Sequence, residues 1–189
     1  MAKNIYLTPH FTLEEMTRTN VKLESYLDRQ RQQQPSEEVI ENLTRVCQWL
    51  EKLREEWNLR YGSLTQEPSL TPNPSPQGEG NSLTPNPSPQ GEGSKEEPII
   101  VTSGYRSPAV NKAVGGCKTS NHLTGCAADL RVLGKEQLLR YAVILLDISD
   151  EAHQDFDELL LERNARGYWL HFAVRPKNNR RKIQLINVI

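Results

Sequence analysis

At residues 120–129 the chain reads SNHLTGCAAD, from Ser120 to Asp129. This stretch places the imidazole of His122 and the carboxylate of Asp129 seven residues apart. A second imidazole, His171, follows about forty residues later inside the run YWLHF. A catalytic zinc ion takes three nitrogen or oxygen ligands and keeps an open position for water. The sequence therefore predicts a zinc site made of His122, Asp129 and His171.

The spacing within this stretch predicts a loop histidine followed by an aspartate on the next strand. Gly125 and the two alanines before Asp129 keep the intervening backbone close and uncluttered. A single histidine is more often an ordinary loop or core residue, so the prediction depends on the combination of the three side chains. Cys126 also lies inside the stretch, but Asp129 has the better spacing for a ligand.

The pattern along the chain predicts an α+β fold, in which N-terminal helices pack on a small antiparallel sheet that carries the zinc site. The longest predicted helix begins at the cap Ser36 and places apolar residues on one face at steps of three and four. Residues 20–35 are polar and carry no predicted element. Besides helix 36–57, we expect helices near 12–16, 107–114 and 135–146, and strands at 99–103, 127–132, 156–162, 168–174 and 183–188.

One segment contrasts with this pattern. Residues 69–80 read SLTPNPSPQGEG, and residues 82–93 repeat the same twelve residues. Proline and glycine dominate, so the segment cannot bury enough apolar surface to offset its ordering entropy. We therefore expect residues 63–97 to be a disordered insertion, and residues 1–62 and 98–189 to form a single domain.

Composition restricts the partners of the protein. The net charge is −1, which gives little support for nucleic-acid binding. The three cysteines form no CxxC pair and predict reduced thiols rather than a disulfide framework, with Cys47 as a small core residue. No apolar stretch approaches the length of a membrane span, and residues 1–6 show no apolar region of the kind found in signal peptides. We expect a monomer that is cytoplasmic by default, unless it is exported or released by other means.

The motif around the predicted ligands resembles a known family. The pattern S-x-H-x-x-G-x-A-x-D from Ser120 to Asp129, preceded by SGYRSP at residues 103–108 and followed by Trp169-x-His171, looks like the zinc D-Ala-D-Ala carboxypeptidases and their phage endolysin relatives. That family cleaves peptide stems and cross-links of bacterial peptidoglycan. The resemblance implies that His122, Asp129 and His171 hold Zn²⁺.

The resemblance also implies roles for two further residues. Arg106 lies sixteen residues before the first zinc histidine, at the position of a family arginine that binds the substrate carboxylate or the developing oxyanion. Ser120 is expected to orient a ligand or the substrate.

The sequence leaves two candidates for the general base. Many family members carry an acidic residue three positions before the last zinc histidine, where this chain has Tyr168, a poor base near neutral pH. Glu158 and Glu162 on the preceding strand are the candidates. If Glu162 pairs with Gly167 across the turn, Glu158 lies directly opposite His171; the resemblance to short family members instead favours Glu162.

We therefore expect a zinc metallopeptidase, a hydrolase that cuts peptide bonds of peptidoglycan stems or cross-links as a carboxypeptidase or an endopeptidase. The alternative is a zinc-containing domain that binds cell-wall peptides without cutting them, which the missing acid at Tyr168 favours. A third hypothesis is a zinc-stabilised scaffold whose proline-rich loop recruits a partner.

Overall fold

The computed structural model describes residues 5–62 and 96–188. The prediction of a disordered insertion at 63–97 falls almost entirely outside these described residues, so it stays a prediction, as does the division into one domain and one insertion. None of the helices that are described is both long enough and apolar enough to cross a bilayer.

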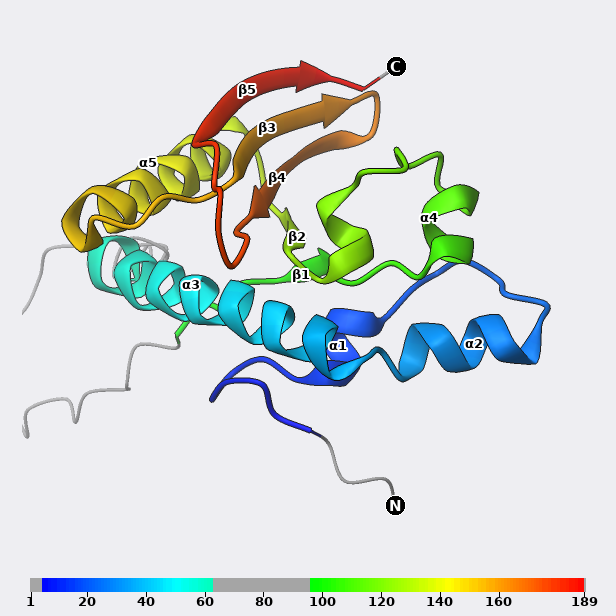
Figure 1. The fold of residues 1–189 in the computed structure, drawn as a ribbon. Helices are drawn as coiled ribbons and strands as arrows, with labels where there is room; N and C mark the ends of the chain where they lie inside the picture. Colours follow the sequence, from blue (N-terminus) through cyan, green and yellow to red (C-terminus); the bar gives the residue numbers. More distant parts are fainter. Residues whose placement is uncertain (1–4, 63–95, 189) are drawn as a thin grey trace, which may run out of the picture.

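The described chain contains six helical segments and five strands (Figure 1). The helices are α1 (Leu13–Thr17), α2 (Tyr26–Gln33), α3 (Glu37–Tyr61), α4 (Pro108–Ala113), the 3₁₀ helix η1 (Asn121–Thr124) and α5 (Lys135–Ala152). The strands are β1 (Val101–Ser103), β2 (Ala127–Arg131), β3 (Glu158–Asn164), β4 (Gly167–Ala173) and β5 (Lys182–Asn187).

The strands form one sheet in the order β1-β2-β4-β3-β5. The pairs β1–β2, β2–β4 and β3–β4 are antiparallel, whereas β5 pairs with β3 in parallel. The predicted α+β fold is therefore confirmed, and the sheet is mostly rather than wholly antiparallel.

Alternation along the strands divides the sheet into two faces. On β4, Leu170 and Phe172 belong to the hydrophobic core, and the Phe172 ring lies 5.3 Å from the ring of Trp49 on α3. Helices α3 and α5 contact each other and supply most helical residues of this core (Figure 1). Since neighbouring strand residues point to opposite faces, His171 lies on the face turned away from these helices.

Helix α3 supplies the longest side of the core. Ser36 caps it by accepting a hydrogen bond from the Val39 amide, as the sequence predicts, and the helix runs a turn further than expected, to Tyr61. Cys47 and Leu50 on its inner face are fully buried. Each leucine-sized side chain buried here contributes about 2 kcal/mol.

The hairpin of β3 and β4 is tighter than the sequence suggested. Asn164 pairs with Gly167, so only two residues form the turn, and Glu162 pairs with Trp169. The pairing of Glu162 with Gly167 is therefore wrong by two positions, and Leu160 rather than Glu158 lies opposite His171. A shift by two keeps the face of every side chain, so both glutamates remain on the face of His171.

Two further departures from the predicted elements concern helices. Helix α2 occupies part of the polar segment that carried no prediction, and α5 continues to Ala152 rather than ending near residue 146. Helix α2 has Gln32 as its one buried residue, so it shows no apolar stripe for sequence analysis to detect.

Candidate metal centre

The first predicted ligand lies in η1, just before strand β2. Ser120 caps η1, and its Oγ accepts a hydrogen bond from the His122 amide. Gly125 ends η1 with a φ of 72°. A Cβ at Gly125 would also lie 2.7 Å from the backbone oxygen of Val39, so the motif needs glycine here for backbone conformation and for space.

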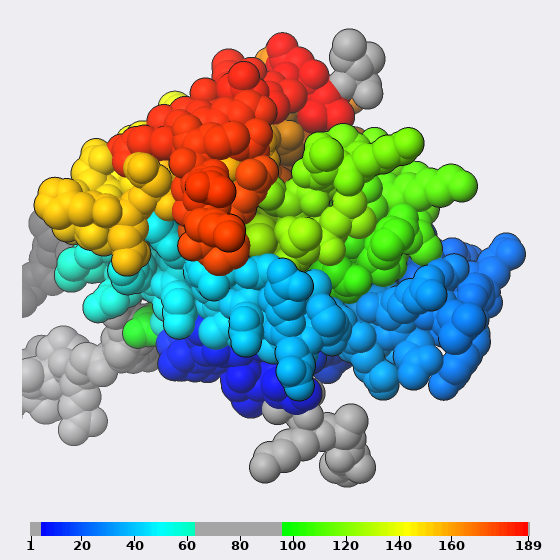
Figure 2. Space-filling model, viewed as in Figure 1, coloured from blue at the N-terminus to red at the C-terminus, as the bar shows by residue number. Residues whose placement is uncertain are grey.

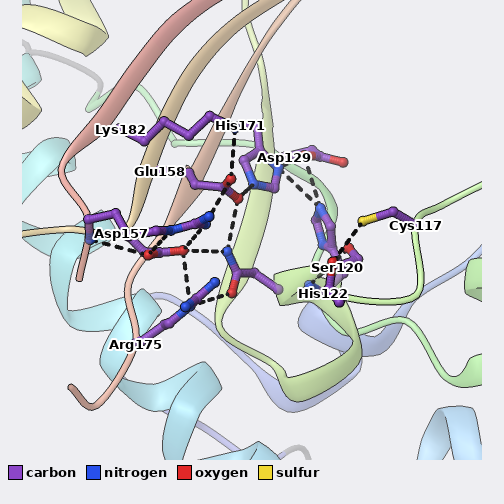
Figure 3. Close-up of polar contacts among 12 residues, drawn as sticks. Cys117, Ser120, His122, Asp129, Asp157, Glu158, His171, Arg175 and Lys182 are labelled. Carbon is purple, nitrogen blue, oxygen red and sulfur yellow. Dashed lines mark hydrogen bonds and ion pairs between the residues drawn. The ribbon is translucent and has the colours of Figure 1, made fainter. Parts of the chain in front are cut away.

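The other two predicted ligands lie on adjacent strands. Asp129 of β2 and His171 of β4 are directly paired in the antiparallel ladder. All three side chains are buried, and one ligand atom from each lies within 4.8 Å of the others. The structure thus brings together the three residues that the sequence singled out (Figure 3).

The distances between these atoms fit a metal ion. Nε2 of His122 lies 3.2 Å from Nδ1 of His171 and 3.2 Å from Oδ1 of Asp129, and His171 Nδ1 lies 2.8 Å from Asp129 Oδ1. Ligands about 2.1 Å from a tetrahedral zinc ion are separated by about 3.4 Å. The two histidine nitrogens and the carboxylate oxygen therefore form one face of a coordination polyhedron of the right size.

A backbone carbonyl sets the orientation of the His122 ring. Its Nδ1 lies 2.7 Å from the oxygen of Gly104, so the proton on Nδ1 is donated there and Nε2 keeps its lone pair toward the cluster. Gly104 is itself tightly packed, because a Cβ on it would lie 2.3 Å from the backbone oxygen of Met16 at α1. Helix α1 thereby supports the first histidine indirectly.

The ring of His171 has the opposite orientation. Its Nδ1 faces Asp129, and its Nε2 points away from the cluster, 3.6 Å from Oε2 of Glu158. That distance is just beyond a hydrogen bond, and Nε2 is buried without a hydrogen-bond partner among the described residues. The ring nitrogen that faces Asp129 is thus the one available to a metal.

Charge complementarity dominates the titration of the cluster. Burial alone would raise the pKa of Asp129, but the charges and hydrogen bonds of His122 and His171 outweigh it and lower that pKa well below its ordinary value. Burial also opposes a charged His171, yet its hydrogen bond with Asp129 and the nearby carboxylate of Glu158 raise its pKa to about 9. A cation is therefore strongly favoured at this position, whether a proton or a metal ion supplies the charge.

Arg106 lies at the edge of the cluster. Its Nη2 forms an ion pair with Oδ2 of Asp129, and its Nε donates to Oγ of Ser103 at 2.8 Å. Among the described residues, no group accepts a hydrogen bond from its Nη1. The guanidinium thus adjoins the proposed metal ligand and keeps donors for an anionic group.

The backbone on both sides of Arg106 is held by one buried side chain that sequence analysis missed. Gln32 of α2 donates from Nε2 to the oxygen of Tyr105 at 2.9 Å, and its Oε1 accepts from the amide of Ser107 at 2.7 Å. A further hydrogen bond from Nε2 reaches the oxygen of Thr17 at 2.7 Å. Helix α2 therefore fixes the turn that carries Arg106.

The two candidate bases differ in their surroundings, although both share the face of His171. Glu158 has ion pairs with Arg180 at 2.9 Å and Lys182 at 3.3 Å. Its interaction with His171, more than any other, lowers the pKa of Glu158 to about 2. Glu162 has no ion pair among the described residues, and burial raises its pKa.

Tyr168 lies on the other face of the sheet. It pairs with Arg163, packs against the hydrophobic core and has the ammonium of Lys135 5.9 Å from its ring centre. A side chain at this position of β4 points away from His171, so the position where many family members carry an acid does not reach the cluster here.

Residues 92–147, which contain the Arg106 turn and the first two predicted ligands, match the family model described as Peptidase M15. The family resemblance is confirmed over this segment. A comparison with curated proteins found no match. The M15 match supports a peptidase, and the M15 peptidases are zinc-dependent, which agrees with a cluster able to hold a metal ion.

Proposed function

We propose that this protein is a zinc-dependent M15 peptidase that hydrolyses peptide bonds of peptidoglycan stems or cross-links. The observation that carries the proposal is the convergence of His122, Asp129 and His171 within 4.8 Å, on the sheet face turned away from α3 and α5. The M15 match supports the peptidase class. The SGYRSP motif resembles the one that carries the substrate-binding arginine of the peptidoglycan peptidases, which supports a cell-wall peptide as the substrate.

In this proposal His122, Asp129 and His171 hold the ion. When bound, zinc would act as a Lewis acid on the peptide carbonyl and make water a stronger nucleophile. The uncommitted Nη1 donors of Arg106 then bind negative charge, either on the carbonyl oxygen in the transition state or on the terminal carboxylate of the peptide. Its ion pair with Asp129 holds the guanidinium against the cluster.

Glu162 is the proposed general base. A general base must be ionised at the working pH, and its carboxylate must be free of ion pairs so that it can accept a proton. Glu162 is half-buried on the face of His171, and its raised pKa reflects that burial. Glu158 is the poorer candidate because cations and Asn121 occupy its oxygens.

The test uses purified full-length protein, its bound metal quantified, and peptidoglycan fragments with intact stems. We expect one zinc per chain and release of D-alanine or of cleaved stems, detected by mass spectrometry. Chelation should abolish release, and added zinc should restore it. One zinc per chain without any cleavage would overturn the peptidase proposal and favour the alternative, a cell-wall peptide-binding domain.

A further inference from the structure

We propose that Glu158 accepts a hydrogen bond from the ring nitrogen of His171 that does not face the metal site, and so braces the ring, and that Asn121 holds Glu158 in place. Neither residue would touch the substrate, so both are positioning residues. This inference rests on the proposed function in one respect, namely that His122, Asp129 and His171 hold zinc.

The first step concerns Nε2, the ring nitrogen of His171 that faces away from Asp129. If Nδ1 ligates a metal, the proton of the neutral ring must lie on Nε2. That nitrogen is buried and has no hydrogen-bond partner among the described residues, while Oε2 of Glu158 is 3.6 Å away. A buried N–H requires an acceptor, and a shift of a few tenths of an ångström would make Glu158 that acceptor. Figure 3 shows Glu158 between His171 and Lys182.

The second step concerns what points Oε2 toward the ring. Asn121 donates from Nδ2 to Oε2 of Glu158 at 2.9 Å and to Oδ2 of Asp157 at 2.7 Å. Its Oδ1 accepts from Nε of Arg175 at 2.9 Å, so both ends of the amide are engaged. Because Asn121 directly precedes His122, the segment with the first histidine also positions the carboxylate behind the second.

The third step concerns the other carboxylate oxygen. Oε1 of Glu158 is bound by Arg180 and Lys182, which leaves Oε2 as the oxygen available to His171. Arg180 also binds both oxygens of Asp157, at 2.8 and 2.7 Å. Asp157 is fully buried, and this cluster therefore anchors the start of β3 to the 174–181 connection, which Figure 2 shows as an orange-red projection against α3.

A carboxylate that accepts the outer N–H of a ligating histidine fixes its tautomer and increases its basicity. The expected consequence is tighter retention of zinc. Removal of such partners typically weakens metal binding about 10- to 100-fold. The role is distinct from that of a general base, whose loss slows hydrolysis and leaves metal affinity intact.

The experiment measures zinc dissociation constants by competition with a chromogenic chelator, for the wild type, Glu158→Ala, Glu158→Gln, Asn121→Ala and Glu162→Ala. We expect about 10- to 100-fold weaker binding for Glu158→Ala and a smaller loss for Asn121→Ala. Glu158→Gln, which keeps an acceptor oxygen, should recover part of the affinity. Glu162→Ala, on the same strand and face, is the matched control and should bind zinc as the wild type does.

Two additional measurements separate positioning from misfolding. Thermal unfolding of the metal-free variants identifies any that fail to fold, in which case Glu158→Gln remains the test. The absorption spectrum of the Co²⁺ form should change for Glu158→Gln because the His171 ligand is altered.

The inference is overturned if folded Glu158→Ala and Glu158→Gln bind zinc as tightly as the wild type and leave the Co²⁺ spectrum unchanged. A wild type that binds no zinc overturns both the brace and the proposed function. Zinc binding without peptide cleavage overturns the peptidase alone, and a weaker affinity of Glu158→Ala would then still support the brace.

Discussion

Asp129 and His171 face each other across strands β2 and β4, and their Oδ1 and Nδ1 atoms are 2.8 Å apart. The hydrogen-bonded ladder thus sets the spacing of two proposed ligands before any metal arrives. His122 is the third, and it is brought to them by η1 through a glycine turn. A site built on paired strands is largely pre-formed, so losing one ligand should affect binding more than folding.

Replacing either proposed histidine ligand should remove the metal. We expect His122→Ala and His171→Ala to lose stoichiometric zinc and all detectable peptide cleavage, because two protein ligands hold zinc poorly. Metal analysis after gel filtration measures this. His10→Ala is the control, since His10 is exposed and paired with Glu51 away from the cluster. Full zinc content in His171→Ala would refute the ligand assignment.

Replacing the proposed base should separate catalysis from metal binding. We expect Glu162→Gln to lower kcat by about 10²- to 10⁴-fold with zinc content unchanged, as loss of a general base does. Steady-state kinetics on a stem peptide, with metal analysis of the same samples, provide the comparison. A Glu162→Gln variant as active as the wild type would return the role of base to Glu158 or to another group.

Gly125→Ala should destabilise the protein by about 1–3 kcal/mol, through its positive φ and the contact with the Val39 oxygen. Gly115→Ala is a matched control, because Gly115 has a φ of 73° but open space around its Cβ position. We expect the control to cost about 1 kcal/mol. Denaturant unfolding of the metal-free proteins measures both, and equal losses would contradict the steric account.

Stability at acidic pH should depend on Asp157. Burial would raise the pKa of this carboxyl, but hydrogen bonds from Arg180 and Asn121 outweigh it, so the pKa is lowered. The stabilisation is therefore present above the unfolded value of about 3.9 and lost as the pH falls through the folded pKa. Unfolding measured from about pH 6 downward should show a weaker pH dependence for Asp157→Asn than for the wild type.

The exposed neighbour Asp155 supplies the control for that experiment. It is paired with Arg181 at 3.2 Å on the surface, where ion pairs contribute little. Asp155→Asn should keep the wild-type pH dependence. If Asp155→Asn and Asp157→Asn behave alike, the buried cluster is not the source of the acid sensitivity.

The segment 63–95 should be replaceable by a short linker. Asn58, near the end of α3, accepts from the amide of Glu97 at 2.7 Å, and Trp57 Nε1 donates to Glu97 Oε2 at 2.8 Å. The chain therefore re-enters the fold close to where α3 ends, and about six glycine and serine residues can span such a gap. We expect unchanged zinc content and melting temperature; a lost thermal transition would show that the segment is needed for folding.

The parts of the structure that sequence analysis predicted share a local signal. The apolar stripe of α3, the capping serine Ser36 and the ligand motif are all read from neighbouring residues, and their positions in the structure agree with the pattern. The ladder then places His171 beside Asp129, which strand alternation alone made possible but did not specify.

The parts that sequence analysis missed depend on contacts between distant residues. Helix α2 is held by Gln32 rather than by an apolar face, so no periodicity indicates it. The expected pairing of Glu162 with Gly167 is wrong by two positions, because the sequence at residues 164–167 only weakly determines the length of the turn. The contacts of Asn121 with Asp157 and Glu158 join residues 36 and 37 positions apart, and no motif reveals them.

The clamp that Gln32 forms around Arg106 has a consequence for protein engineering. The side-chain amide of Gln32 in α2 holds the backbone carbonyl before Arg106 and the backbone amide after it. The orientation of the guanidinium is therefore set by a helix that contributes no side chain to the metal cluster. Mutant libraries that vary only the residues around the metal would not change how Gln32 positions Arg106. Altering position 32 and its neighbours on α2 is therefore a route to redirecting substrate preference while the three proposed ligands stay unchanged.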